Sequence, residues 1–141
     1  MQLMVPDLRG PRVFVVRLPS GLILLNSNDR RNRWVHAGLV KEIRTAAWAI
    51  AKQQKIPPLD RVHIVGEHRP VNVRVRDAAN MYPSFKAAID GIVQAGVLAN
   101  DDDAHVDGPH MVTGPIDEAA KARRLRHGSI VLTLTELPTA P

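Results

Sequence analysis

Hydrophobic and polar residues alternate near the start of the chain in a pattern that predicts a pair of β-strands. Residues 13–18 alternate and are rich in β-branched side chains, and Leu22 to Leu25 is a second apolar segment. Between the two lies Pro19-Ser20-Gly21, a sequence typical of turns. The pattern therefore predicts a β-hairpin, followed by a polar and basic loop over residues 26–34.

Two stretches carry apolar residues at the three- and four-residue spacing of an amphipathic helix. The first runs from His36 to about Lys55 and ends before Pro57-Pro58, and its apolar positions are Leu39, Ile43, Ala47 and Ile50. The second begins near Pro83, a residue suited to the first helical position, and Gly96 fits its C-terminal cap. Its apolar stripe is Phe85, Ala88, Ile89, Ile92 and Val93.

The remaining pattern predicts short strands and a third helical segment. Strands are expected at Val62 to Val65, over residues 71–76, from Val112 and over residues 130–136. Residues 117–126 form a basic helical segment, residues 100–108 an acidic loop, and residues 136–141 a frayed tail. Without regular alternation of strands and helices, the expected class is α+β. We predict one domain over residues 1–141, with a mixed sheet and two main helices packed against it.

Composition narrows the class of protein. The 141 residues suffice for one domain with a substantial core. Cysteine is absent, which excludes disulfides and thiolate zinc sites and suits a reducing compartment. The chain has no apolar run long enough to span a membrane, and Asp7 interrupts the N-terminus where a signal peptide would be apolar. A cytoplasmic location is therefore expected.

The formal net charge of +5 is compatible with binding to nucleic acid. Net charge alone hardly distinguishes a DNA-binding protein from a basic protein that binds no nucleic acid. The arginines that we expect to contact a phosphate backbone lie in three clusters: Arg30, Arg31 and Arg33; Arg74 and Arg76; and Arg123, Arg124 and Arg126.

Carboxylates flank the second helix. Asp77 precedes it, Lys86 and Asp90 lie on it, and Asp101, Asp102 and Asp103 follow it. Carboxylates from separate segments could together supply the oxygen ligands of Mg²⁺. Each also has a simpler interpretation: Asp77 as a helix cap, Lys86 with Asp90 as a surface ion pair, and the aspartate run as a solvated turn.

Other sites fit the sequence less well. A calcium-binding EF-hand starting at Asp101 would place His105 and Val106 where an acidic residue and a glycine are needed. His63, His68, His105 and His110 follow no familiar zinc-ligand spacing. We expect Trp34 and Trp48 in the core rather than as platforms for stacked bases.

In combination, four segments resemble the core signature of RusA-like Holliday junction resolvases. They are Arg76-Asp77-Ala78-Ala79-Asn80, then Lys86 to Gly91, Ala95-Gly96-Val97, and Asp102 to Val106. Residues 26–36 and the terminal Ile130 to Glu136 are also similar to that family, so the resemblance covers most of the chain. The Asp-Ala-Ala-Asn form is similar to versions found in actinobacteria and their phages.

The resemblance implies a homodimer that cleaves four-way DNA junctions with Mg²⁺ in recombination and repair. By position, Asp77 and Asp103 match metal-binding and catalytic aspartates, and Lys86 matches the catalytic lysine. Asp102 and Asp90 match further candidate metal ligands.

The sequence departs from the family pattern at two points. The second aspartate of the pair is replaced by Ala79, and Asn80 lies farther from Lys86 than in the usual motif. Two alternatives therefore stay open. One is a nucleic-acid-binding module that has lost its metal, and the other is a less selective nuclease that cuts flaps or forks.

Overall fold

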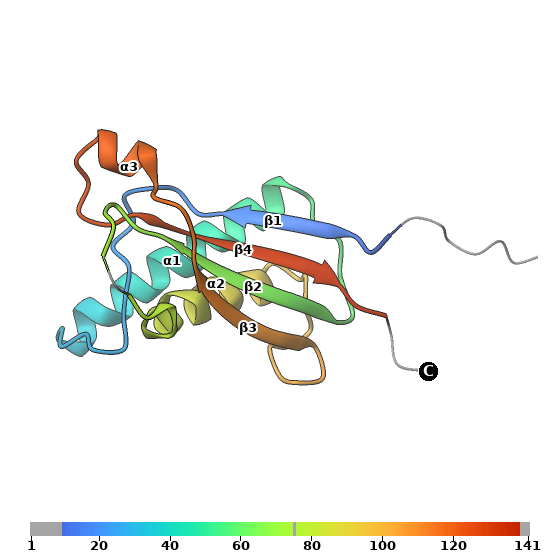
Figure 1. Cartoon of the computed structure of the whole chain (residues 1–141). Helices are drawn as coiled ribbons and strands as arrows, with labels where there is room; N and C mark the ends of the chain where they lie inside the picture. Colours follow the sequence, from blue (N-terminus) through green and yellow to red (C-terminus); the bar gives the residue numbers. More distant parts are fainter. Residues whose placement is uncertain (1–9, 75, 139–141) are drawn as a thin grey trace, which may run out of the picture.

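The computed structural model describes residues 10–74 and 76–138. These residues form a mixed four-stranded sheet with two main helices on one face, which confirms the predicted α+β class (Figure 1). The strands are β1 (Val13–Arg17), β2 (Val62–Arg69), β3 (Val106–Thr113) and β4 (Ser129–Glu136), arranged in the order β1-β4-β2-β3. The helices are α1 (Arg33–Gln53), the 3-10 helix η1 (Ala78–Met81), α2 (Tyr82–Gln94) and the short α3 (Glu118–Ala122).

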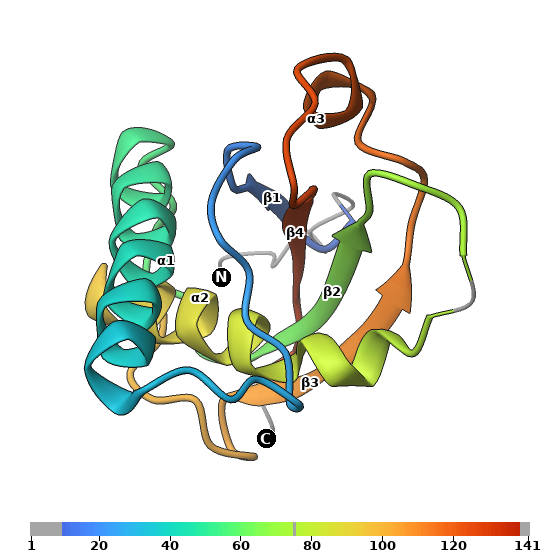
Figure 2. The same cartoon turned by 90° about the vertical axis from the view of Figure 1, so that its left-hand side faces the viewer.

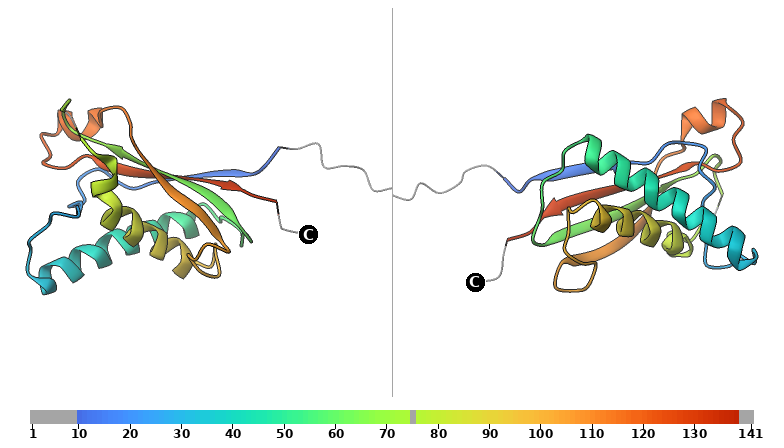
Figure 3. Two further views of the ribbon diagram at one scale, coloured as in Figure 1. Left: turned by 60° about the horizontal axis from the view of Figure 1, so that its bottom comes forward. Right: turned by 180° about the vertical axis from the view of Figure 1, so that it is seen from behind.

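The central strand β4 pairs antiparallel with both β1 and β2, while β2 and β3 run parallel. Helices α1 and α2 pack on each other and cover the same face of the sheet, as Figures 2 and 3 show. Among residues 10–74 and 76–138, no helix lies over the centre of the opposite face of the sheet (Figure 3). None of the described helices is long and apolar enough to cross a membrane.

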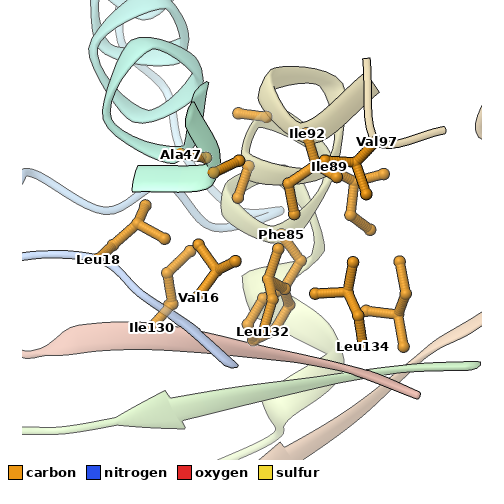
Figure 4. Close-up of a cluster of buried hydrophobic side chains, with 14 of the residues drawn as sticks. Val16, Leu18, Ala47, Phe85, Ile89, Ile92, Val97, Ile130, Leu132 and Leu134 are labelled. Atoms are coloured by element: carbon orange, nitrogen blue, oxygen red, sulfur yellow. The ribbon is translucent and has the colours of Figure 1, made fainter. Parts of the chain in front are cut away.

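The core fills the space between the helices and the sheet (Figure 4). Phe85 of α2 is fully buried, and its ring lies on β2 where Gly66 has no side chain: a Cβ there would lie 2.8 Å from the ring. Gly91 lets α2 approach α1 closely, because a Cβ at Gly91 would lie 2.2 Å from the carbonyl oxygen of Arg44. The core therefore depends on two close approaches that only glycine permits.

The predicted N-terminal hairpin is wrong. Residues 22–25 form no strand, and β1 pairs with the last strand instead, Val13 opposite Thr135 and Arg17 opposite Val131. Leu24 and Leu25 are apolar because they are buried in the core. The Leu25 backbone bonds to the buried Ser84 hydroxyl, with its N–H donating at 2.7 Å and its carbonyl accepting at 2.8 Å.

The prediction of a strand over residues 71–76 is also wrong. Residues 71–74 and 76 form an irregular loop, in which Val73 is 87% exposed. Pro70 ends β2, which is longer than predicted, and residue 75 lies outside the described residues. Strand β3 begins at Val106, within the expected acidic loop and before Val112. The C-terminal helical segment is shorter than predicted.

Several smaller boundaries also differ from the predictions. Helix α1 begins at Arg33, earlier than predicted, so Trp34 belongs to the helix. The expectation that both tryptophans lie in the core is wrong, because Trp34 is 73% exposed and Trp48 is 38% exposed. Glu136 belongs to β4, and the Leu137 N–H donates to the Arg61 carbonyl, so the ordered chain extends beyond the expected start of the tail. Asp7 lies outside the described residues.

Candidate nucleic-acid interface and metal-ligating groups

An open cleft of about 560 Å³ lies where two polar loops meet η1. The loops span residues 26–32 and 70–77, far apart in the sequence. The backbone N–H of Ser27 donates to the Asn80 carbonyl at 2.8 Å, which joins the first loop to η1. The cleft is lined by Asn26, Asn28, Asp29, Arg30, Arg31, His68, Arg74, Arg76, Asp77, Asn80 and Met81.

Four of the arginines expected to contact DNA line this cleft together with Asp77. Arg31 is paired with Asp29, and an Arg76 guanidinium nitrogen donates to Asn72. Arg30 and Arg74 are exposed, and within the described residues neither has a carboxylate partner. Among the described residues, the charges of Arg30 and Arg74 are therefore not paired with a carboxylate.

Two groups among the residues that line the cleft are shielded from water. The Arg76 Nε is buried and has no hydrogen-bond partner in the part of the chain that the structure describes, and burial and the neighbouring Arg74 lower the Arg76 pKa. His68 is only 7% exposed. Its pKa is lowered to about 4, first by burial and then by the positive charges of Arg76 and His127.

The other predicted arginines lie outside the cleft. Arg126 lines a smaller adjoining hollow of about 220 Å³ with Arg74 and Arg76. The Arg33 guanidinium lies over the exposed Trp34 ring, 5.0 Å from its centroid. Arg123 is the C-terminal cap of α3 and Arg124 follows it, and neither lines the cleft.

Asp77 caps η1, as its simpler interpretation predicted. Its side chain accepts a hydrogen bond from the Ala79 N–H at 3.0 Å. One oxygen is thus used for capping, yet the carboxylate is exposed and lines the cleft. Capping and a function in the cleft are compatible.

Lys86 is held between two carboxylates. Its ammonium lies 2.5 Å from Asp90 Oδ1 and 2.5 Å from Asp101 Oδ2. Burial lowers the Lys86 pKa, but hydrogen bonds to Asp101 and Asp90 outweigh it and leave the pKa raised. In return, the hydrogen bond from Lys86 lowers the pKa of Asp101. The predicted Lys86–Asp90 pair therefore extends to a third residue and ties the acidic loop to α2.

The other two aspartates of the acidic loop have different surroundings. Asp102 accepts from the Ala104 N–H, and its Oδ1 lies 2.5 Å from His105 Nδ1, so it organises the turn before β3. Asp103 is exposed.

One chain does not gather these carboxylates around a common point. Asp77 lies before the N-terminus of α2 and the acidic loop follows its C-terminus, and the 13 residues of the helix between them span about 20 Å. Asp77, Asp90, Asp102 and Asp103 supply no trio of ligand atoms within 4.8 Å of one another in the described part of the chain. A single copy of the chain therefore does not bring these carboxylates together around one Mg²⁺ ion.

A different metal-ligating group occurs on β2 and β3. His63, Asp107 and His110 have ligand atoms that all lie within 4.8 Å of one another. Of the four histidines whose spacing matched no zinc-ligand pattern, His63 and His110 thus lie together, and Asp107 lies with them. His68 and His105 lie elsewhere, in the cleft and beside Asp102. Sequence spacing gave no signal for this group, because its members meet only through strand pairing.

Comparison of the sequence with protein-family models and with curated proteins gives no match. The interpretation of both sites therefore rests on the residues and their geometry.

Proposed function

We propose that this protein is a structure-specific endodeoxyribonuclease that binds and cuts branched DNA, with four-way junctions as its main substrate. The observation that carries the proposal is the cleft, where Arg30 and Arg31 from one loop meet Arg74 and Arg76 from another around Asp77. The RusA-like sequence signature supplies the proposed reaction, hydrolysis of a phosphodiester.

The cleft suits a polyanion better than a small apolar ligand. Its walls are mostly arginine and asparagine side chains, which donate hydrogen bonds to phosphate oxygens. Such contacts position a duplex arm without reading its sequence. Arg30 and Arg74 can bind phosphate without first breaking an ion pair with a carboxylate.

An exposed aromatic residue next to the cleft favours branched DNA over plain duplex. Trp34 lies two residues after the end of the cleft loop and is 73% exposed, with Arg33 stacked on it. Bases are unstacked at a branch point, and an exposed indole with a cation offers them a stacking surface. In an intact duplex the bases are already stacked on one another and offer no such face.

The proposal includes a divalent cation, as the resemblance implies, but one chain does not assemble the carboxylates that would hold it. We therefore propose a homodimer as the working form. A second copy brings a second set of carboxylates, and two-fold symmetry supplies the paired centres that two symmetric nicks require. Such a substrate implies a cytoplasmic location, with which the absence of cysteine is compatible.

One alternative function is favoured by specific observations. Ala79 lacks a carboxylate, and the 13 residues of α2 separate Asp77 from the acidic loop within one chain. Both fit a non-catalytic module that binds branched DNA. A nuclease that prefers flaps or forks would share the cleft and differ only in substrate selectivity.

The test is cleavage of labelled four-way junction, flap, fork and linear duplex in Mg²⁺, together with a binding assay in Ca²⁺. The expected result is junction cleavage that Asp103→Asn and Asp77→Asn abolish without weakening binding, and that the exposed Asp60→Asn leaves intact. Binding without cleavage supports the non-catalytic module. Faster cleavage of flaps or forks transfers the function to those substrates, and absence of junction binding refutes the proposal. Sedimentation gives the oligomeric state, and an active monomer contradicts the proposed dimer.

A further inference from the structure

The open face of the sheet carries a cluster of polar side chains that the proposed function does not use. Along β2 the buried positions alternate: Val62 and Ile64 point into the core beneath the helices. His63, between them, therefore points to the open face. His68 follows His63 on β2 by an odd number of positions, so the two side chains point to opposite faces of the strand. His68 points to the core side and lines the cleft. His63 and the cleft are thus on opposite faces of β2.

An irregularity in β3 places two more ligands beside His63. His63 is opposite Asp107, but two residues farther along β2, Val65 is opposite His110, so β3 has one extra residue in between. The bulge contains Gly108, which has φ +122°, and a Cβ there would lie 2.6 Å from the Ile64 carbonyl oxygen. Residues three apart in a regular strand point to opposite faces. Here the extra residue lets Asp107 and His110 share one face.

The three side chains converge at ligand distances. His63 Nδ1 lies 2.8 Å from Asp107 Oδ2, and His110 Nε2 lies 3.2 Å from Asp107 Oδ1. The two imidazole rings are stacked, with centroids 4.6 Å apart. Two atoms bound to one tetrahedral metal at about 2.1 Å are themselves roughly 3.4 Å apart, so small side-chain rotations would suffice to admit an ion.

We propose that His63, Asp107 and His110 form a binding site for one divalent transition-metal ion, with Zn²⁺ as the preferred occupant. Two imidazole nitrogens and one carboxylate oxygen suit zinc and neighbouring transition metals, whereas Mg²⁺ prefers oxygen ligands and its own waters. Three protein ligands leave a fourth position open. The side chains of all three are between 35% and 53% exposed, so that position faces solvent and is free for a water molecule.

The test is Zn²⁺ titration of untagged, metal-free protein, by calorimetry and by competition with a chromophoric chelator. One equivalent of Zn²⁺ is expected to bind, and excess Mg²⁺ should not displace it. Loss of a residue that only supports a metal ligand already costs about 10–100-fold in metal affinity. His63 and His110 are proposed as direct ligands, so His63→Ala and His110→Ala should each weaken Zn²⁺ binding on the order of 100-fold. His36→Ala, which removes a histidine of α1 outside the cluster, should change nothing.

A second readout does not depend on affinity. Co²⁺ added in place of Zn²⁺ should give visible absorption bands of a low-coordinate nitrogen and oxygen site, and these should be absent in His110→Ala. His110 has an exposed side chain, so its replacement should leave the fold intact, which circular dichroism checks. Absence of stoichiometric binding, or binding of Zn²⁺ by both ligand variants as tight as that of wild type, overturns the proposal. Neither measurement involves DNA, so the result is independent of the nuclease proposal.

Discussion

His68 should make the folded protein sensitive to mild acid. In the unfolded chain this imidazole takes up a proton near pH 6.5, whereas in the folded protein its pKa is about 4. Between these values the unfolded chain binds more protons, so stability is constant above about pH 6.5 and falls as the pH drops toward 4. At about 1.36 kcal/mol per pKa unit the complete loss is roughly 3 kcal/mol, of which about 2 kcal/mol is reached by pH 5.

The assay is urea unfolding of wild type and His68→Gln at pH 7.5 and pH 5. Wild type should lose about 2 kcal/mol more than the variant between the two pH values. The lowered pKa of His127 acts in the same direction but is present in both proteins, so the difference isolates His68. The lowered pKa values of Asp101 and Asp107 remove stability only at lower pH, below the usual aspartate value. An equal loss of stability in both proteins would show that His68 is not held neutral by burial.

Three further predictions test the helices and the proposed DNA contacts. Lys86→Ala should lower the unfolding free energy by less than about 1 kcal/mol, because the ion pairs of Lys86 are partly exposed. The same variant should slow single-turnover junction cleavage on the order of 10²-fold. A cleavage rate within about threefold of wild type would mean that Lys86 only holds the acidic loop against α2. Gly91→Ala should lower the unfolding free energy by about 2 kcal/mol in a denaturation experiment, since its Cβ would meet the Arg44 carbonyl. The control is Gly38→Ala, whose Cβ would have no atom nearby. This variant should raise the unfolding free energy by about 0.5–1 kcal/mol in the same experiment. Trp34→Ala should weaken junction binding about tenfold and duplex binding less, as measured by anisotropy; equal losses on both substrates would exclude stacking on unpaired bases.

The two main helices could be predicted from the sequence because their apolar spacing is local and their buried faces are wide. Strand pairing was harder. Leu24 and Leu25 are as apolar as a strand, but they are buried beside Ser84 without pairing. The start of β3 could not be predicted because β3 is an edge strand, and its open face carries polar residues such as Asp107 and His110.

The candidate site was predictable residue by residue but not as an assembly. The arginines and Asp77 stood out through charge and motif, yet their meeting in one cleft depends on how the loop at residues 26–32 bonds to η1. The separation of Asp77 from Asp103 follows from the length of α2, which the sequence did predict. The pairing of His63 with His110 depends on a parallel register and a bulge, neither of which leaves a spacing pattern in the chain.

The cleft is the central claim, and salt-dependent binding to a four-way junction tests it most directly. The cleft variant is Arg30→Gln with Arg74→Gln, and the charge-matched control is Lys52→Gln with Arg61→Gln, two exposed cations outside the cleft. Each arginine that neutralises a phosphate contributes about 0.9 to the slope of log affinity against log salt, so two contribute about 1.8, or roughly 60-fold at 0.1 M relative to 1 M salt. The cleft variant should show both the smaller slope and the roughly 60-fold weaker junction binding at 0.1 M salt, while the control should bind like wild type. Equal weakening of the two variants would mean that net charge, not the cleft, binds DNA, and would contradict the account.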